Sequence, residues 1–399
     1  MAKIRACVYD YASPSGVKMI ELSPPKRSSK TALIRVRACG VNPVDAKYVI
    51  GDKLPESWMQ WAARRATGHT PGFDFSGTVV EIAAGNPYGL VAGDEVFGFA
   101  SNPIHFFKHK LHGSFGEMIA APLDQIAKKP SALTHVEAAA VPLVGTTALQ
   151  AFMQHGIGSR AGQRLLIVGA SGGVGHIAVQ VARHLGCVVT AVCSGRNASF
   201  VEKECGAHAV LAYDDGDVYA AIAADAAAHG AYDFVLDCVS SADARDVAAS
   251  YAARLRAMSP PVIGRGKDFD GHNYVVLGGA TRHWAKAGLK RFTSLNTFQS
   301  GFELFWIKMP GSVGVLKRLA AFADAAPVTS TEGSAAAEET AVLRPLRPKV
   351  ETRLDFSEAG ARTAFDTLRG RRTAGKIVME MRPPPGAQPT QVAVDVNDE

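Results

Sequence analysis

The sequence predicts an α/β fold in which a β-rich region is followed by a doubly wound parallel sheet. In the first part of the chain, short alternating or apolar runs are bounded by glycine or proline, which is typical of strands. In the middle, short apolar strands alternate with helical stretches, which indicates a parallel sheet. With 399 residues, of which 47% are hydrophobic, the chain can form about two to three domains with buried cores.

The β-rich region starts at the N-terminus, where MAKIRACVYDY alternates like a strand. Further strands are expected at 31–38, 75–82 and 94–99. Residues 51–71 are interpreted as a loop with a helical centre. Its Trp58, Met59 and Trp61 either line an apolar pocket or only pack.

In the middle of the chain, five short apolar strands are separated mostly by helical stretches. They are expected at 163–168, 188–193, 208–212, 232–237 and 274–277, and residues 291–298 are a candidate for a sixth. Two polar or proline-rich segments without an apolar period lie at 325–348 and 383–399. Such compositions predict disorder rather than packed structure.

A glycine-rich turn follows the first strand of the middle region. After QRLLIV the chain reads G-A-S-G-G-V-G over 169–175, followed by HIAVQVARHLG, which reads as a helix. In such a βαβ unit, one glycine makes the tight turn, one lets the backbone approach a pyrophosphate, and Gly175 lets helix and strand pack closely. The N–H groups at the helix N-terminus then hold the phosphates. The motif predicts a dinucleotide site, with a ligand-free βα turn as the alternative. Its residues are Gly169, Ser171, Gly172, Gly173, Val174 and Gly175.

The end of the next strand distinguishes NAD from NADP. A carboxylate there would bind the ribose 2′-hydroxyl, but the chain has none and reads Cys-Ser-Gly-Arg-Asn over 193–197. Arg196 can hold a 2′-phosphate through charge-assisted hydrogen bonds, with Ser194 and Asn197 beside it. Tyr213, after the third strand, is expected to close the pocket. The interpretation is NADP(H), and a solvated surface arginine is the alternative.

The composition argues against several other classes of protein. The 43 Lys and Arg residues are scattered and the net charge is +6, so no nucleic-acid partner is expected. No pair of the six cysteines has C-x-x-C spacing, which argues against a zinc ribbon and fits a reducing compartment. The longest uncharged stretch, 138–159, contains proline, glycine and polar residues, so no transmembrane segment is expected. The N-terminus lacks the apolar core of a signal peptide.

A series of stretches in a specific order covers nearly the whole chain. They are RVRACGVNPVDAKYVIG (35–51), PGFDFSGTVVEIAAG (71–85), GDEVFGF (93–99), GSFGEMIAAPLDQIAKKP (113–130), EAAAVPLVGTTALQAF (137–152), GASGGVG (169–175), YDFVLDCV (232–239) and GKIVMEM (375–381). In these motifs the chain resembles the zinc-free quinone-oxidoreductase group of the medium-chain dehydrogenase/reductase superfamily. Residues 274–309 are most similar to the mitochondrial reticulon-interacting branch of that group.

The resemblance implies a GroES-like partial β-barrel catalytic domain, built from both chain ends, around a central Rossmann domain. The implied boundaries are 1–135 for the first part of the catalytic domain, 136–300 for the Rossmann NADP(H)-binding domain, 301–382 for the return to the catalytic domain with a flexible insertion at 325–348, and 383–399 for a tail. Further cofactor contacts are also implied. They are Thr147, Leu277, Gly278 and Gly279 at the nicotinamide, Lys376 at the phosphates, and Cys238 after the fourth strand.

The same resemblance argues against a metal. Where zinc alcohol dehydrogenases of the superfamily carry Cys, His and Cys ligands, this chain has Asn42, Phe73 and Leu143. Because phenylalanine and leucine cannot ligate zinc, a catalytic site with three protein ligands is not expected. The four-cysteine structural lobe is also absent, since no cysteine occurs between Cys39 and Cys187.

Without a metal, hydride transfer needs an acceptor that hydrogen bonds can polarise. Quinones and enones are such acceptors, because charge develops on a carbonyl oxygen that neutral donors can hold. Asn42, Lys47 and Tyr48 lie in the segment that lines the family's pocket. Tyr48 is a candidate proton donor, whereas Asn42 and Lys47 either take part in the chemistry or orient loops. Asp45 is expected to hold the loop.

The chain departs from the family in two places. Residues 250–272 (SYAARLRAMSPPVIGRGKDFDGH) replace a short run to the fifth strand, and 325–348 replaces a short turn. The leading hypothesis is an NADPH-dependent reductase of quinones or α,β-unsaturated carbonyls, acting as a homodimer or in a larger assembly. The alternative is a reductase fold kept as a structural subunit with little or no turnover. By resemblance the protein is expected in the mitochondrial matrix, with the cytosol as the alternative.

Overall fold

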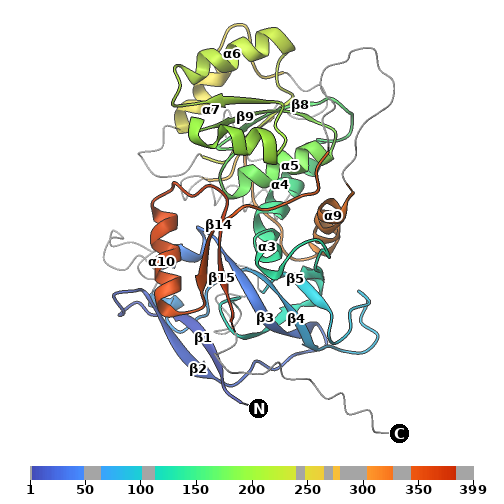
Figure 1. Ribbon diagram of the computed structural model, residues 1–399, viewed down its shortest axis with the longest axis vertical. Coiled ribbons are helices and arrows are strands. Elements are labelled where there is room, and N and C mark those ends of the chain that lie inside the picture. The colour runs from blue at the N-terminus through green and yellow to red at the C-terminus, as the bar shows by residue number, and fades with distance from the viewer. Residues whose placement is uncertain are drawn as a thin grey trace.

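The computed structural model describes residues 2–48, 64–100, 113–239, 248–264, 273–278, 303–326 and 343–382, with only the backbone described at 47–48 and 248–250. Two large sheets dominate the molecule. A mostly antiparallel sheet lies at the end that carries the N-terminus, and a parallel sheet with helices around it lies at the other end (Figure 1). This arrangement confirms the predicted fold class, a GroES-like β domain beside a Rossmann domain.

The first sheet, called the barrel sheet here, is built from both ends of the chain. Its strands run in the order β14-β15-β3-β4-β5-β7, and β6 also pairs with β3. The bounds are β3 Thr31–Val41, β4 Asp74–Glu81, β5 Glu95–Phe99, β6 Met118–Pro122, β7 Ile126–Lys128, β14 Val350–Asp355 and β15 Lys376–Glu380. Ile377 of β15 lies opposite Val41 of β3, so the last described strand sits beside one of the first.

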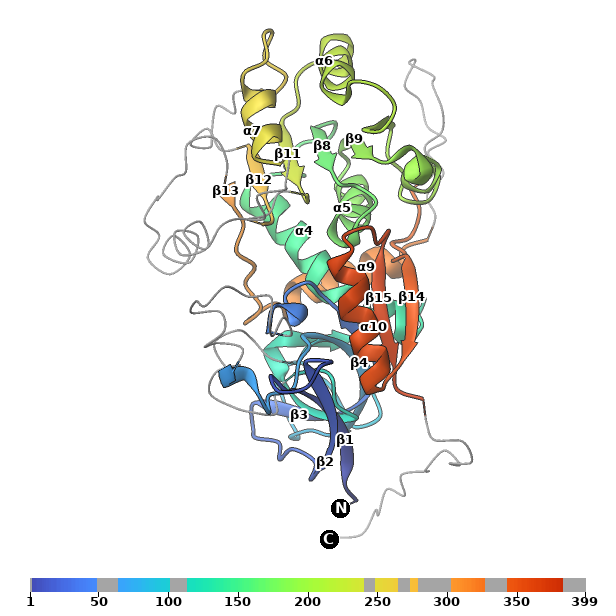
Figure 2. The same cartoon turned by 90° about the vertical axis from the view of Figure 1, so that its left-hand side faces the viewer.

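Period-two alternation explains the central strand of this sheet. In β3, Arg35 and Arg37 alternate with the buried Ile34, Val36 and Ala38. Helix α10 (Glu358–Arg369) packs against β14 and β15 and covers one side of the sheet (Figure 2). Strands β1 (Ile4–Tyr9) and β2 (Val17–Leu22) form a separate antiparallel hairpin.

The second sheet is wholly parallel, in the order β10-β9-β8-β11-β12-β13. Its strands are β8 Arg164–Val168, β9 Val188–Cys193, β10 Ala209–Ala212, β11 Phe234–Asp237, β12 Tyr274–Val276 and β13 Glu303–Leu304. The first five agree with the predicted strands to within two residues at every boundary. The sixth strand of this sheet is β13, whereas the candidate at 291–298 lies outside the described residues.

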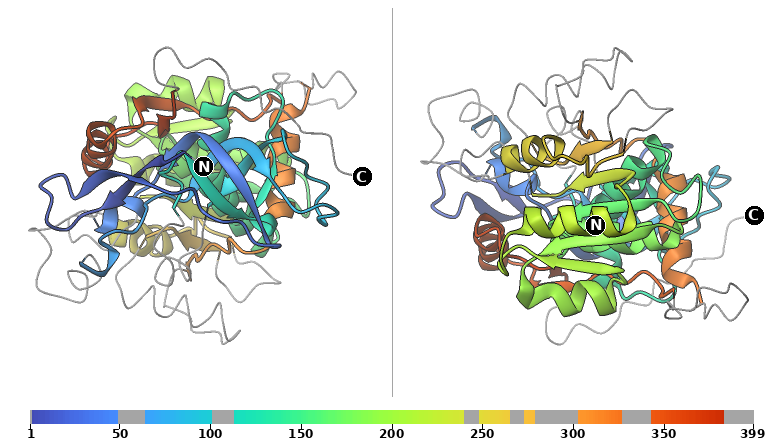
Figure 3. Two further views of the ribbon diagram at one scale, coloured as in Figure 1. Left: turned by 90° about the horizontal axis from the view of Figure 1, so that it is seen from below. Right: turned by 90° about the horizontal axis from the view of Figure 1, so that it is seen from above.

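Helices lie on both sides of the parallel sheet, as a doubly wound fold requires (Figure 3). The helices not yet introduced are α3 His135–Ala139, α4 Pro142–Gln154, α5 Gly173–His184, α6 Val218–His229, α7 Ala248–Arg256 and α9 Val313–Asp324. Helix α3 begins with a capping box, in which Thr134 and Glu137 bond each other's backbone N–H groups. The side chain of Asp217 caps α6 in a similar position.

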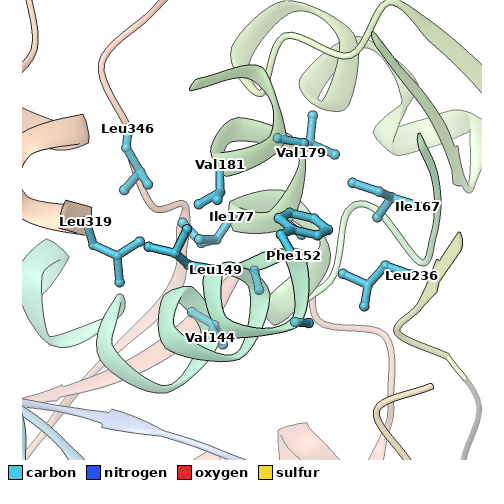
Figure 4. Close-up of a cluster of buried hydrophobic side chains, with 14 of the residues drawn as sticks. Val144, Leu149, Phe152, Ile167, Ile177, Val179, Val181, Leu236, Leu319 and Leu346 are labelled. Carbon is cyan, nitrogen blue, oxygen red and sulfur yellow. The ribbon is translucent and has the colours of Figure 1, made fainter. Parts of the chain in front are cut away.

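The core beneath the parallel sheet joins α4, α5 and α9 (Figure 4). Phe152 and Leu149 of α4 pack there with Ile177 of α5 and Ile167 of β8. A Cβ at Gly145 would lie 2.8 Å from a methyl group of Leu319, so α4 and α9 cross closely here, and a larger residue at 145 would have to displace that methyl group. The close crossing sets the position of α4, whose N-terminus faces the site described below.

Several sequence predictions fall on residues that the structure does not describe. These are most of the insertion (327–342), the tail (383–399), and Trp58, Met59 and Trp61. None of the helices in the described ranges has the length and apolar character needed to cross a membrane.

Candidate active site

The glycine-rich turn between β8 and α5 has the shape that the motif predicts. Gly169 has φ 77°, in the left-handed region, and a Cβ there would come within 2.6 Å of Val239. A Cβ at Gly175 would lie 2.2 Å from the carbonyl oxygen of Gly169, so α5 can start this close to the turn only with glycine. The first N–H groups of α5 have no acceptors within the helix and point out of its N-terminus. The residues present therefore fit a pyrophosphate.

The carboxyl ends of the parallel strands bring other predicted cofactor residues to the same edge. The side-chain amide of Asn197 donates to Ser171 Oγ at 3.2 Å and to Ser194 Oγ at 3.1 Å. Three residues predicted from two separate motifs are thus in direct contact. The other described ones lie in α4 or just after strands of the same sheet: Thr147, Tyr213, Cys238, Leu277 and Gly278. Gly279 lies outside the described residues.

The loop between α10 and β15 adds basic side chains to this edge. Arg371 donates from Nη2 to the carbonyl oxygen of Val239 at 3.1 Å. Its φ of 52° lies in the left-handed region, which costs a residue with a Cβ about 1–2 kcal/mol. Arg196 is exposed and donates to the carbonyl oxygen of Arg372 at 3.4 Å. The sequence singles out Arg196 alone, because Arg371 reaches the edge from a distant part of the chain.

A carboxylate also lies at this edge, next to the turn that carries Arg196. The sequence shows no acidic residue directly after β9, but Asp214, which follows β10, accepts a hydrogen bond from the N–H of Gly195 at 2.7 Å. Its charge lies beside the turn that carries Arg196. An acidic group at this place favours ribose hydroxyls, whereas an arginine favours a 2′-phosphate. Arg196 and Asp214 thus bring opposite charges to the same turn.

On the barrel-sheet side of the site, a buried polar network joins three strands. Asn42 follows β3, Asp74 begins β4 and Lys376 begins β15, and none of the three is more than 3% exposed. Lys376 Nζ donates to Asn42 Oδ1 at 2.5 Å, to the carbonyl oxygen of Val41 at 3.1 Å and to Asp74 Oδ2 at 3.4 Å. Asn42 Nδ2 donates to Asp74 Oδ2 at 3.0 Å. Because an ammonium only donates and a carboxylate only accepts, the network fixes which end of the Asn42 amide is oxygen.

Asp74 also connects this network to the start of α4. Its Oδ1 accepts a hydrogen bond at 2.9 Å from the N–H of Leu143, in the first turn of that helix, where a negative charge is favoured. Burial raises the pKa of Asp74, while Lys376, Asn42 and Leu143 oppose that rise as donors. The sequence alone does not single out Asp74, although it stands next to Phe73 in a family motif.

The loop at 42–48 is held by Asp45, as the sequence indicates. Asp45 Oδ2 accepts a hydrogen bond from the N–H of Asn42 at 2.8 Å, and the Tyr9 hydroxyl donates to the Asp45 carbonyl oxygen at 2.7 Å. The carboxyl group is fully buried, and within the described ranges Oδ1 has no hydrogen-bond partner. Burial raises the pKa of Asp45 to about 8, so the group is largely protonated at neutral pH.

The structure places the predicted catalytic residues in or next to this loop. Asn42 is 1% exposed, and both ends of its side-chain amide are hydrogen-bonded within the protein. This arrangement suits a residue that orients the loop. Lys47 and Tyr48 belong to the short helix η1 (Asp45–Tyr48), and their side chains lie outside the described residues. Lys376, predicted at the phosphates, instead directs its ammonium toward Asn42 and Asp74.

The side chains at the expected metal-ligand positions do not fit zinc. The oxygen of Asn42 is occupied by an ammonium, Phe73 is a buried aromatic ring, and the Leu143 side chain has no donor atom. Zinc sites need three or four nitrogen, sulfur or oxygen ligands. Among the residues that the structure describes, no group of three or more His, Cys, Asp or Glu could hold a metal ion.

A GroES-like sheet beside a Rossmann sheet, with a glycine-rich turn between β8 and α5, is the arrangement that the resemblance to medium-chain dehydrogenase/reductases implies. Two family models match the chain: the alcohol dehydrogenase GroES-like domain at residues 28–131 and the zinc-binding dehydrogenase model at residues 173–255. Together with the relatives below, these matches make the chain similar to the medium-chain dehydrogenase/reductase superfamily and, within it, to the quinone-oxidoreductase group.

Three curated relatives illustrate the similarity. The chain is 34% identical over 205 residues to the chloroplast envelope quinone oxidoreductase homolog of Arabidopsis thaliana, covering 50% of this chain and 57% of that protein. It is 34% identical over 220 residues to the mitochondrial NAD(P)H oxidoreductase RTN4IP1 of Bos taurus, covering 52% and 51%. It is 34% identical over 194 residues to the trans-enoyl reductase pgmF of Aspergillus terreus, covering 47% and 50%. The chain spans about half the length of the curated relatives it matches.

Solved structures agree on the fold. The quinone oxidoreductase from Coxiella burnetii has a TM-score of 0.66 at 24% identity, covering 96% of this chain and 100% of that one. A putative zinc-dependent alcohol dehydrogenase from Rhizobium etli has a TM-score of 0.69 at 22% identity, covering 96% and 99%. Since neighbours with and without zinc in their descriptions fit equally well, the fold does not decide the chemistry.

Proposed function

We propose that this chain is a zinc-independent, NADPH-dependent oxidoreductase that transfers a hydride to a quinone or an α,β-unsaturated carbonyl. The observation that carries this proposal is the Lys376 ammonium, which lies 2.5 Å from Asn42 Oδ1, the position of the first expected metal ligand. A divalent cation bound at the same oxygen would meet a positive charge at hydrogen-bonding distance, and Coulomb repulsion opposes that arrangement. Phe73 and Leu143 offer no side-chain ligand to compensate.

The class of hydride acceptor follows from the side chains at the three expected metal-ligand positions. A site without three metal ligands has no metal to polarise a simple aldehyde, so it suits acceptors that conjugation already activates. Quinones and enones are such acceptors. The names of two relatives, a quinone oxidoreductase homolog and a trans-enoyl reductase, support this acceptor class.

NADPH, when bound, would supply the hydride. The turn at 169–175 would hold its pyrophosphate, and Thr147 with the backbone of Leu277 and Gly278 would orient the nicotinamide. Tyr48 would give a proton to the reduced acceptor, as the sequence predicts, from a loop whose start is fixed by Asn42 and Asp45.

The cofactor preference depends on the charges at the ribose end. Arg196, together with Arg371, would bring positive charge to a 2′-phosphate, which favours NADPH. Asp214 acts against this preference.

We place the protein in the mitochondrial matrix, with the cytosol as the alternative, because relatives are described as mitochondrial or chloroplast proteins. We expect a homodimer or a subunit of a larger assembly.

The test is NADPH oxidation with a panel of quinones and enals, compared with ethanol oxidation on NADP⁺. Turnover of a quinone or enal without turnover of ethanol is expected. Elemental analysis of chelator-washed protein should find no stoichiometric zinc. Ethanol turnover at a comparable rate, or one zinc per chain, would overturn the proposal. Tight NADPH binding without turnover of any acceptor would favour a structural subunit instead.

A further inference from the structure

The start of β15 contacts both halves of the site. Gly375 donates its backbone N–H to the carbonyl oxygen of Ser171 in the glycine-rich turn, at 2.9 Å. The next residue, Lys376, donates its ammonium to Asn42 on the opposite side. A Cβ built on Gly173 would lie 3.5 Å from Lys376 Cδ, so the stem of the lysine runs beside the turn. Two consecutive residues therefore connect the cofactor turn with the loop at 42–48.

The ammonium of Lys376 has no donor to spare for a phosphate. It carries three N–H groups, and its three acceptors are Asn42 Oδ1, the Val41 carbonyl oxygen and Asp74 Oδ2. The pair with Asp74 is buried on both sides, at 3% and 0% side-chain exposure. A buried charge is held most firmly by its partner, because separating the two leaves each without solvent or counter-charge.

The side-chain amide of Asn42 connects the Lys376 ammonium to the loop at 42–48. Its oxygen accepts from Lys376 and its nitrogen donates to Asp74, so the side chain cannot turn over without placing two donors face to face. The backbone N–H of the same residue donates to Asp45 Oδ2. The first residue of the loop is therefore fixed through both its side chain and its backbone.

We propose that Lys376 is a positioning residue that, through the Asn42 amide, fixes the loop at 42–48 relative to the glycine-rich turn. The inference rests on the proposed function in that this loop carries the proton donor, and goes beyond it by assigning the coupling of cofactor and acceptor sites to one buried ammonium. Lys376 then governs the geometry of the acceptor loop and not the affinity for the cofactor.

The primary test is the double variant K376M/D74N. The single variant K376M leaves Asp74 buried without its cation. The added amide at position 74 can still accept from Leu143, and it can donate to the Asn42 oxygen once the Asn42 amide, freed from Lys376, turns over. The double variant thus keeps a neutral, hydrogen-bonded core but loses the bonds from the ammonium to Asn42 and Val41.

K376R keeps the charge and donors, and K349M is the matched control, since the Lys349 ammonium pairs with Glu351. Three quantities are measured on the full chain: hydrogen exchange at 40–48, the NADPH dissociation constant, and kcat with KM for a quinone or enal.

In K376M/D74N, hydrogen exchange at 40–48 should become faster and kcat/KM should fall, each by about tenfold or more. This magnitude corresponds to the loss of one charge-assisted hydrogen bond. The NADPH dissociation constant should stay unchanged. K376R should recover part of both losses, and K349M should match the wild type in all three quantities. Weaker NADPH binding with unchanged hydrogen exchange would indicate that Lys376 contacts the cofactor phosphates, and it would overturn the proposal. A lower melting temperature with unchanged exchange and kcat would also overturn it. If the wild type reduces no acceptor, the proposed function fails, while exchange and NADPH affinity still decide the role of Lys376.

Discussion

His176 of α5 accepts a hydrogen bond at 3.1 Å from the backbone N–H of Lys349, which leads into β14 of the barrel sheet. The other ring nitrogen, Nδ1, faces the carbonyl oxygen of Gly172 at 2.8 Å and must donate to it. Burial lowers the pKa of His176 to about 4, so the ring is neutral at pH 7 and can accept from Lys349. One neutral imidazole thus joins the glycine-rich turn to the other domain.

Acidification is expected to destabilise the fold through His176. Its pKa in the folded state lies below the ordinary value of 6.5, so the unfolded chain takes up the proton first. The stabilisation is complete above about pH 6.5 and is lost toward about pH 4, at about 1.4 kcal/mol per pH unit. Urea titrations across this range should show a steeper loss for the wild type than for His176→Gln, which donates and accepts without titrating. Parallel curves for the two proteins would contradict this.

Arg196→Ala should weaken NADPH binding by about 10- to 100-fold, because one charge-assisted hydrogen bond to the 2′-phosphate is lost. NADH lacks that phosphate, so its dissociation constant should barely change. Fluorescence titration with both cofactors measures the two values. Equal losses for NADPH and NADH would show that Arg196 does not contact the 2′-phosphate.

Asp214→Asn should move the preference toward NADPH. The substitution removes a negative charge next to the 2′-position and keeps an oxygen that can accept from Gly195. The side chain is exposed and screened by solvent, so a gain of about 2- to 5-fold in NADPH affinity over NADH is expected. The same titrations serve as the measurement. A shift toward NADH would mean that the carboxylate does not face the ribose.

Arg371→Gly and Arg371→Ala should separate side chain from backbone. Both variants lose the same guanidinium, so both should weaken NADPH equally. They differ in the backbone, because glycine accepts the φ of 52° without strain and alanine does not. Thermal unfolding should therefore find the glycine variant more stable, by about 1 kcal/mol. Unchanged NADPH affinity in both would remove Arg371 from the cofactor site.

Tyr48→Phe should lower kcat for enals if the hydroxyl delivers the proton, by about 10²- to 10⁴-fold. Quinones take protons readily from water and should lose much less. Steady-state rates with one enal and one quinone at saturating NADPH give the comparison. Equal losses for both acceptors would point to damaged packing rather than to a missing proton donor.

The strands could be predicted because their signal is local. The five predicted strands of the parallel sheet are mostly apolar runs, and β9 occupies the predicted range 188–193. The two-residue strand β13 has too short a run for any period, and its position is set by pairing with β12. The glycine-rich turn was predictable for the same reason, since all its residues are adjacent in the sequence.

The polar partners could not be predicted because they depend on register between distant strands. Asp74 and Lys376 are 302 residues apart, and they meet only because β15 pairs with β3 in one particular register. Asp214 lies beside Arg196 because β10 is the neighbour of β9. A motif assigned to one strand says nothing about the side chains that neighbouring strands bring to it.

The position of β15 has a consequence during synthesis. Because the ribosome makes the chain from its N-terminus, Asp74 emerges 302 residues before the ammonium that will neutralise it. Until β15 arrives, β3 keeps an unpaired edge opposite residues 377–380, and open strand edges are where chains associate wrongly. The edge of β3 and the Asp74 carboxylate therefore stay without these partners until β15 has been made. That edge is the surface a molecular chaperone would need to shield.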